Sequence, residues 1–324
     1  MTKTWKKLLA ACLSAAMLLS LAACSKKDNG EENKDPQEDQ QENQQQGIVT
    51  PDGTVLDSSW KAIDIDGETV YWDGDFVYEP KNDLDIMNLD FTEFGDDYFT
   101  NTYPVTVDSY VLCEGKDTAT TVYHIKSENP GPVLYIIGGV HGDEQAGWYT
   151  ATLMRNVTIS CGELYVLCCA NQTGAKNHSR MVNGATDLNR VFPGKADGND
   201  AEQLAYAIYS DVEAKKPEFV FDLHEAIIYT EGRDCLGSTL IFTDLKGMED
   251  MYFDLLFATE DGTICHNPFE QSGPGPEGSV NATITRNLGI PVITVETLRG
   301  FDIHRRVQDQ LDIVQFVLDY KGML

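Results

Sequence analysis

An uninterrupted apolar run over residues 132–140 constrains the fold of this chain most strongly. A run of this kind indicates a strand that is buried on both faces. It leads into Gly138-Gly139-Val140-His141-Gly142-Asp143-Glu144, where the two glycines allow the backbone to turn tightly. Asp143 and Glu144 are expected in the first turn of a helix, where the helix dipole favours acids. The stretch therefore predicts a buried strand, a tight turn and a helix.

The rest of the chain repeats this alternation. Apolar strand patterns occupy residues 105–112, 120–125, 164–170, 219–223, 239–243 and 290–295. Helical patterns begin at Asp143 and at Asn199-Asp200, and the chain closes with an amphipathic helix that carries Val307, Leu311 and Val314. Continuously apolar strands that alternate with helices predict an α/β fold, a three-layer α/β/α sandwich around a mostly parallel mixed sheet.

Residues 48–102 differ from this pattern, because they are acidic and aromatic and contain several Asp-Gly turn signals. Residues 69–72 and 76–78 flank one of these turns and suggest a small hairpin. We therefore expect residues 48–102 to form a small N-terminal extension with β structure. The main α/β domain would occupy residues 103–324.

Residues 1–23 have the pattern of a targeting segment, with three lysines followed by an apolar run that is short for a membrane span. The run ends in Leu21-Ala22-Ala23-Cys24, which resembles the bacterial lipobox. The resemblance implies cleavage before Cys24 and a lipid anchor on its thiol, so the protein would lie outside the cytoplasm on the bacterial cell membrane. The alternative is an ordinary secretory signal. Residues 24–47 are acidic and rich in glutamine, which predicts a disordered tether.

Charge and cysteine content exclude some partners. The net charge is -28, and no basic stripe interrupts the acidic composition, which excludes a nucleic-acid partner. Export would permit disulfides, but the cysteine spacing does not select a pairing. No Cys-x-x-Cys pair occurs, which disfavours a zinc centre made of thiolates. The oligomeric state is left open by these patterns.

His141 and Glu144 are the first candidate metal ligands. They are three residues apart at the strand-to-helix corner, so both side chains can converge on one point. An imidazole and a carboxylate together suit a zinc ion. A surface corner with a capping acid and a hydrogen-bonded histidine would give the same short pattern.

Three other apolar strands also end in polar residues, namely Asn171, His224 and Glu296. The carboxyl ends of parallel strands meet at the edge where ligands bind in open α/β sheets. His224 would be a third metal ligand and would leave an open coordination position for water. Asp222 would orient a neighbouring group, and Glu296 would accept a proton from the attacking water. A backbone-bonded histidine and a solvated loop acid are the simpler alternatives.

Arginines in the loop between these strands favour a negatively charged substrate. Arg180 and Arg190 suit a substrate carboxylate and a developing oxyanion. Pairing with surface acids would also account for them.

Together these motifs resemble the zinc carboxypeptidase superfamily, in its succinylglutamate desuccinylase/aspartoacylase branch. The resemblance rests on the following segments: Gly138 to Glu144, Asn171-x-x-Gly174, Arg180, Asp187-Leu188-Asn189-Arg190-x-Phe192-Pro193-Gly194, Asp222-Leu223-His224 and Val295-Glu296-Thr297.

The resemblance assigns a role to each of these residues. His141, Glu144 and His224 would bind one zinc ion, and Glu296 would be the general base and acid. Arg180 would polarise the scissile carbonyl group, and Asn189 and Arg190 would hold a substrate carboxylate. We add Asn171 as a further candidate substrate-binding residue from its position at a strand end.

We therefore interpret the chain as a lipid-anchored, zinc-dependent amidohydrolase that cleaves an amide bond in an N-acyl amino acid or a short peptide with a carboxylate. The segment from His266 to Ser279 lacks the tyrosine that carboxypeptidases proper carry before their catalytic glutamate, which argues against a true peptide carboxypeptidase. A metallocarboxypeptidase of peptidoglycan stem peptides is the alternative enzyme. A non-catalytic lipoprotein that binds a small ligand is the alternative from another class.

Overall fold

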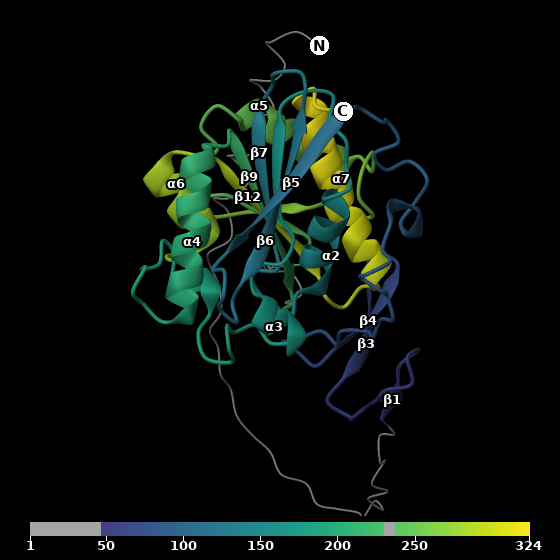
Figure 1. Ribbon diagram of the computed structural model, residues 1–324. Helices are drawn as coiled ribbons and strands as arrows, with labels where there is room; N and C mark the ends of the chain where they lie inside the picture. Colours follow the sequence, from purple (N-terminus) through teal and green to yellow (C-terminus); the bar gives the residue numbers. More distant parts are fainter. Residues whose placement is uncertain (1–46, 230–236) are drawn as a thin grey trace, which may run out of the picture. The chain divides into compact units, whose positions relative to one another are not determined.

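Eight strands form a mixed central sheet in the order β11-β10-β12-β9-β7-β8-β6-β5 (Figure 1). Along the chain these are β5 (Val105–Leu112), β6 (Thr120–Ser127), β7 (Val133–Gly138), β8 (Glu163–Leu167), β9 (Phe219–Ala226), β10 (Thr239–Ile241), β11 (Glu270–Ser272) and β12 (Val292–Leu298). The four central strands β12, β9, β7 and β8 are parallel to one another. Antiparallel pairs join β10 to β12, β6 to β8 and β5 to β6.

The figure depicts a computed structural model, and it describes residues 47–229 and 237–324. The predicted leader, Cys24, Cys235 and the predicted tether up to residue 46 lie outside the described residues. No helix in the described ranges combines the length and apolarity that a membrane span requires.

Helices cover both faces of the sheet. They are α2 (Gln145–Met154), α3 (Gln172–Lys176), α4 (Asp200–Lys215), α5 (Glu249–Glu260), α6 (Val280–Leu288) and α7 (Ile303–Tyr320), with short 3-10 turns η2 (Phe91–Glu93) and η3 (Leu188–Arg190). The apolar faces of α2, α5 and α7 pack on one side of the sheet, and those of α4 and α6 pack on the other. Figure 1 shows the sheet between α4 and α6 on one side and α2 and α7 on the other. The α/β/α sandwich predicted from the sequence is confirmed.

The extension packs against the carboxyl end of β12 and the start of α7. Its strands are β1 (Ile48–Val49), β2 (Val55–Leu56), β3 (Lys61–Ile65) and β4 (Glu68–Trp72). Val70 and Val77 bury their side chains against Leu298 and Phe301. The main partner of β4 is β3, whereas the expected pairing with residues 76–78 is reduced to one bridge between Trp72 and Val77. The same segment also pairs with the residues that follow β9: the N–H of Val77 donates to the carbonyl oxygen of Ile227, and Phe76 forms a bridge with Ile228.

Two boundaries differ from the sequence expectation in ways that matter for the site. Helix α2 begins at Gln145 with Glu144 as its N-cap residue, so Asp143 and Glu144 precede the first turn. Strands β9 and β12 extend two residues beyond His224 and Glu296. The parallel register of these strands pairs Glu296 with His224 across the sheet. The paired strands therefore fix the relative positions of His224 and Glu296. Glu144 precedes the first turn of α2, so its side chain can turn toward them.

Gly147 sets how closely α2 approaches β9. A Cβ atom added there would lie 2.4 Å from the carbonyl oxygen of Leu223, next to His224. Helix propensity alone would make Gly147→Ala stabilising by about 1 kcal/mol. Overpacking typically costs about 1–3 kcal/mol, and because backbone cannot yield easily we expect about 2–3 kcal/mol here and a net loss of roughly 1–2 kcal/mol.

Urea unfolding of the full chain measures this loss. Ala214→Gly on the exposed face of α4 is the control, and it should lose about 1 kcal/mol from propensity alone. A Gly147→Ala protein as stable as the wild type would contradict the close approach.

Candidate functional site

His141, Glu144 and His224 meet at the carboxyl edge of the sheet. His141 and Glu144 lie on the turn between β7 and α2, and His224 lies in β9. One ligand atom from each side chain lies within 4.8 Å of the other two, and all three residues are buried. The turn packs so tightly on α3 that a Cβ atom at Gly142 would lie 2.1 Å from backbone atoms of Gly174 and Ala175. Only glycine fits at this position of the motif.

The three side chains use particular atoms. The Nδ1 atoms of His141 and His224 lie 2.7 Å from Glu144 Oε1 and Oε2, respectively. The two Nδ1 atoms are 3.1 Å apart. Both imidazoles thus direct the same ring nitrogen at one another and at the carboxylate.

Two further carboxylates hold the opposite ring nitrogens. Asp187 Oδ1 lies 3.1 Å from His141 Nε2, and Asp222 Oδ1 lies 2.9 Å from His224 Nε2. Asp222 itself accepts a hydrogen bond from Thr294. A carboxylate beside Nε2 favours a proton on that atom and leaves the lone pair on Nδ1. The sequence predicted the orienting role of Asp222, but it did not assign Asp187 to His141.

The histidines and carboxylates of this cluster stabilise one another's charged forms. Burial would raise the pKa of Glu144, but His141 and His224 hold it well below its usual range. Burial would lower the pKa of His224, but Asp222 and Glu144 raise it well above its usual range. Asp187 is half-buried, and its contacts with His141 and Arg180 lower its pKa.

These observations fit a bound metal ion. If Nε2 carries the proton on each ring, two nitrogen lone pairs and a carboxylate converge at distances that are repulsive without a cation or extra protons. Two imidazole nitrogens and one carboxylate are a donor set that suits a divalent transition metal, and the carboxylates at the opposite ring nitrogens orient the imidazoles. The residues present therefore fit a metal ion.

Glu296 faces this cluster from the neighbouring strand. It lines the same cavity as His141 and Glu144, and its carboxylate has no hydrogen bond or ion pair with the described residues. Desolvation raises the pKa of Glu296 to about 8; His224 opposes this rise, and Glu144 reinforces it. A carboxylate of this kind is suited to proton transfer near neutral pH.

Arg180 reaches the cluster from the loop that follows α3. Its Nε donates to Asp187 Oδ2 at 3.0 Å, and its Nη1 lies 3.1 Å from His141 Nδ1. Its side chain is 37% exposed, so part of the guanidinium group is accessible from the cavity. Asp187 therefore orients both a candidate metal ligand and the arginine beside it.

The other candidate residues differ in their positions. Arg190 is exposed at the cavity and donates to the carbonyl oxygen of Asn189. Asn189 also lines the cavity, but it is buried and its Oδ1 accepts a hydrogen bond from the backbone of Val280. The amide of Asn189 thus fixes the start of α6 as well as facing the site.

Asn171 does not fit the substrate-binding role expected for it. Its side chain is fully buried, does not line the cavity and caps α3 through the N–H of Gly174. Its Nδ2 donates to the carbonyl oxygen of Arg180. Because both ends of the amide are used in this way, Asn171 is placed to position the backbone of Arg180.

The cavity has a volume of about 380 Å³. Besides the residues above, its lining includes Asp143, Glu225, Ala226, Ile227, Ile228, Ile241, Ser272, Pro274, Gly275, Pro276, Ser279, Asn281, Thr294 and Arg299. None of its described lining residues is a tyrosine. Arg180 pairs with Glu144 at 3.3 Å and with Asp187 at 3.0 Å, so among the described lining residues the unpaired positive charge comes from Arg190.

A buried network of charges supports one wall, and sequence reasoning missed it. Glu79 of the extension lies 2.5 Å from Arg299 and 3.2 Å from Arg306. Arg306 also pairs at 2.6 Å with Glu225, the residue that follows His224. The sequence signal for this network is Arg306, which lies beside the apolar face of the last helix. Because Arg299 pairs with Glu79 and Asp143, its charge is neutralised at the cavity wall.

Comparison with known proteins agrees with this geometry. Residues 130–314 match the model of the succinylglutamate desuccinylase/aspartoacylase catalytic domain. No match was found among curated proteins.

Several solved structures share the fold. A succinylglutamate desuccinylase from Silicibacter sp. TM1040 is 17% identical with a TM-score of 0.53, over 69% of this chain and 72% of its own. An aspartoacylase family protein from Mesorhizobium loti is 21% identical with a TM-score of 0.52, over 69% of each chain. A cell shape determinant protein from Helicobacter pylori is 14% identical with a TM-score of 0.53, over 68% of this chain and 55% of its own.

At these identities the structural matches show a shared fold alone. The family match spans more than half of the chain, and the sequence motifs indicate the same family. The chain belongs to the succinylglutamate desuccinylase/aspartoacylase family, a family of deacylase-like and metallopeptidase-like hydrolases.

Proposed function

We propose that this protein is a zinc-dependent amidohydrolase that cleaves an N-acyl amino acid or a short peptide bearing a carboxylate. The observation that carries the proposal is the convergence of His141, Glu144 and His224 on one another, beside a cavity that His141 and Glu144 share with Glu296. Two histidines and one glutamate leave coordination positions open, as catalytic zinc sites do. Glu296 adds the proton acceptor that a purely structural metal site does not need.

A zinc ion held by His141, Glu144 and His224 would supply Lewis acidity, which activates water and polarises a carbonyl group. Glu296 takes a proton from the attacking water as the new C–O bond forms. Arg180 donates to the carbonyl oxygen as negative charge develops on it. Glu296 then delivers the proton to the leaving nitrogen as the C–N bond breaks, which yields a carboxylic acid and an amine.

Arg190 supports recognition of a substrate carboxylate. It is exposed at the cavity, and its only hydrogen bond among the described residues is to the backbone of Asn189. Its charge is therefore available to a ligand, unlike that of Arg299. A bidentate guanidinium–carboxylate contact would orient the substrate with its amide bond toward Glu296.

The site of action belongs to the proposal as well. The basic leader, the apolar run, the lipobox ending at Cys24 and the polar tether occur in the order of a bacterial lipoprotein. We place the enzyme outside the cytoplasm, anchored to the membrane through Cys24. Muropeptides are accessible there, so a peptidoglycan stem peptide is the alternative substrate.

A substrate panel distinguishes the alternatives. The purified full chain is incubated with N-acyl amino acids and with muropeptides, with and without a chelator, and the products are identified by mass spectrometry. Chelator-sensitive release of an amino acid from its acyl group supports the deacylase. Release of a terminal residue from muropeptides supports the peptidase, and ligand binding without turnover supports a non-catalytic lipoprotein.

The metal ligands generate the first prediction here. His224→Ala removes one of three ligands, so we expect most of the zinc at this site and nearly all activity to be lost. Zinc content is measured after dialysis, and His304→Ala, outside the cluster, is the control. An unchanged zinc content and activity in His224→Ala would refute the ligand assignment.

Glu296→Gln separates catalysis from metal binding. The amide keeps the size of the side chain but cannot accept the proton, so turnover should fall about 10²–10⁴-fold. Zinc content should stay normal, because the three ligands are unchanged. Steady-state kinetics beside metal analysis tests this, with Glu277→Gln on the exposed loop as the control. Near-normal turnover in Glu296→Gln would mean that another residue is the base.

Arg190→Ala should show the complementary behaviour. Loss of a charge-assisted contact of about 1.5–3 kcal/mol should raise KM for carboxylate substrates roughly 10- to 100-fold, with a smaller change in kcat. Arg286→Ala on exposed α6 is the control. If KM rises equally for an amidated substrate without the carboxylate, Arg190 does not recognise that group.

Cys24→Ser tests the anchor. Without the thiol no lipid can be attached, so the protein should be released or should remain as an unprocessed precursor. Membrane fractions and the mass of the mature N-terminus report this directly. Processed protein that stays in the membrane fraction of Cys24→Ser would exclude lipidation at this residue.

A further inference from the structure

A second group of metal-binding side chains lies outside the cavity described above. Cys265 lies on the loop after α5, and Asp309 and Asp312 lie one turn apart on α7. One ligand atom from each of the three residues lies within 4.8 Å of the other two. Residues three apart on a helix share a face, so both carboxylates can turn toward the thiol.

Asp309 carries an oxygen that lacks a partner in a buried position. Its side chain is fully buried, and Oδ1 accepts hydrogen bonds from the backbone N–H and the Nδ1 of His266, both at 2.8 Å. Within residues 47–229 and 237–324, Oδ2 has no hydrogen-bond partner. A buried carboxylate oxygen is unfavourable unless a donor or a cation lies beside it. This oxygen belongs to a carboxylate of the cluster, and a donor or a cation beside it would relieve its cost.

The backbone of the loop is held in place around this point. The N–H of Cys265 donates to Asp312 Oδ2 at 2.8 Å, and the hydroxyl of Tyr98 donates to Asp312 Oδ1 at 2.8 Å. The Cys265 thiol approaches the backbone oxygen of Asp309 at 3.5 Å. The three ligand candidates are thus fixed relative to one another without any ion.

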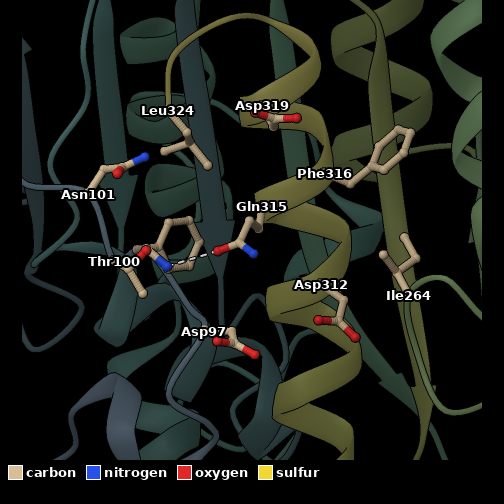
Figure 2. A pocket seen from close by; sticks show the side chains of 10 residues that line it. Asp97, Thr100, Asn101, Ile264, Asp312, Gln315, Phe316, Asp319 and Leu324 are labelled. Carbon is tan, nitrogen blue, oxygen red and sulfur yellow. Dashed lines mark hydrogen bonds between the residues drawn. The ribbon is translucent and has the colours of Figure 1, made fainter.

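An acidic hollow borders the cluster at Asp312. Figure 2 shows Asp97, Asp312 and Asp319 among the side chains that line a cavity of about 320 Å³ beside α7. Asp312 belongs both to this cavity and to the cluster. Because carboxylates line the hollow, its potential favours the entry of a cation.

We propose that Cys265, Asp309 and Asp312 form a second metal site, which binds a divalent ion of the zinc or cobalt type. One thiolate with carboxylate oxygens suits a borderline ion, whereas calcium and magnesium prefer oxygen ligands alone. On binding, the thiol of Cys265 releases its proton to solvent, and the ion contacts the unpartnered oxygen of Asp309. The site shares no residue with the proposed zinc centre and does not depend on the proposed function.

An ion at this position would join three parts of the molecule. It would clamp the loop after α5 to α7, and Tyr98 would connect the N-terminal extension to the same point. The clamped loop continues into β11, whose Ser272 lines the catalytic cavity. The second ion would stabilise this wall and take no part in the reaction.

Cobalt(II) tests the proposal in the reduced full chain. The candidate catalytic ligands include no sulfur, so a thiolate-to-cobalt charge-transfer band in the near ultraviolet reports the second site alone. We expect this band in the wild type and in His224→Ala, which lacks a ligand of the first site. Cys265→Ser should lose the band and bind one cobalt ion fewer, whereas Cys113→Ser should match the wild type.

Asp309→Asn provides an independent variant if Cys265→Ser does not fold. It keeps the size of the side chain but removes its charge, so the band should require at least tenfold more cobalt. Absence of the band from the wild type would overturn the proposal. Its persistence in Cys265→Ser would also overturn it, because another thiol would then hold the ion.

Discussion

The site depends on two imidazole rings that present Nδ1 to one carboxylate. This arrangement holds because Asp187 and Asp222 occupy the opposite nitrogens, at 3.1 and 2.9 Å. With Nε2 protonated, the lone pairs of His141 and His224 and the charge of Glu144 converge on one point. A cation resolves that repulsion, so the surrounding carboxylates determine that the cluster can hold a metal ion.

The sheet supplies the geometry that this interaction requires. Parallel pairing of β9 with β12 places Glu296 opposite His224, and the glycine turn after β7 delivers His141 and Glu144 to the same edge. The buried carboxylate of Glu225, the residue after His224, is neutralised by an ion pair with Arg306. Glu79 of the N-terminal extension pairs with Arg299 and Arg306 and so links the extension to this wall of the cavity.

Much of the fold and the site could be predicted from the sequence, because apolar runs followed by His141, His224 and Glu296 are local patterns. Helix α5 and helix α6 were not predicted, and the buried residues of α6 include Asn281, Thr283 and Thr285, which a search for apolar residues alone does not mark as core positions. Asn171 was assigned to substrate because a strand-end position does not reveal a helix cap. The partnership of Asp187 with His141 and the Glu79 network depend on contacts between distant segments, which no local spacing encodes.

The most direct test of the central claim is a crystal structure of the zinc-loaded protein with anomalous scattering measured at the zinc edge. The account predicts a peak within about 2.0–2.2 Å of His141 Nδ1, His224 Nδ1 and a Glu144 oxygen. Asp187 and Asp222 should remain bonded to the Nε2 atoms, and Glu296 should face the open side of the ion. A loaded crystal without density at this point, or with zinc bound through Nε2, would contradict it.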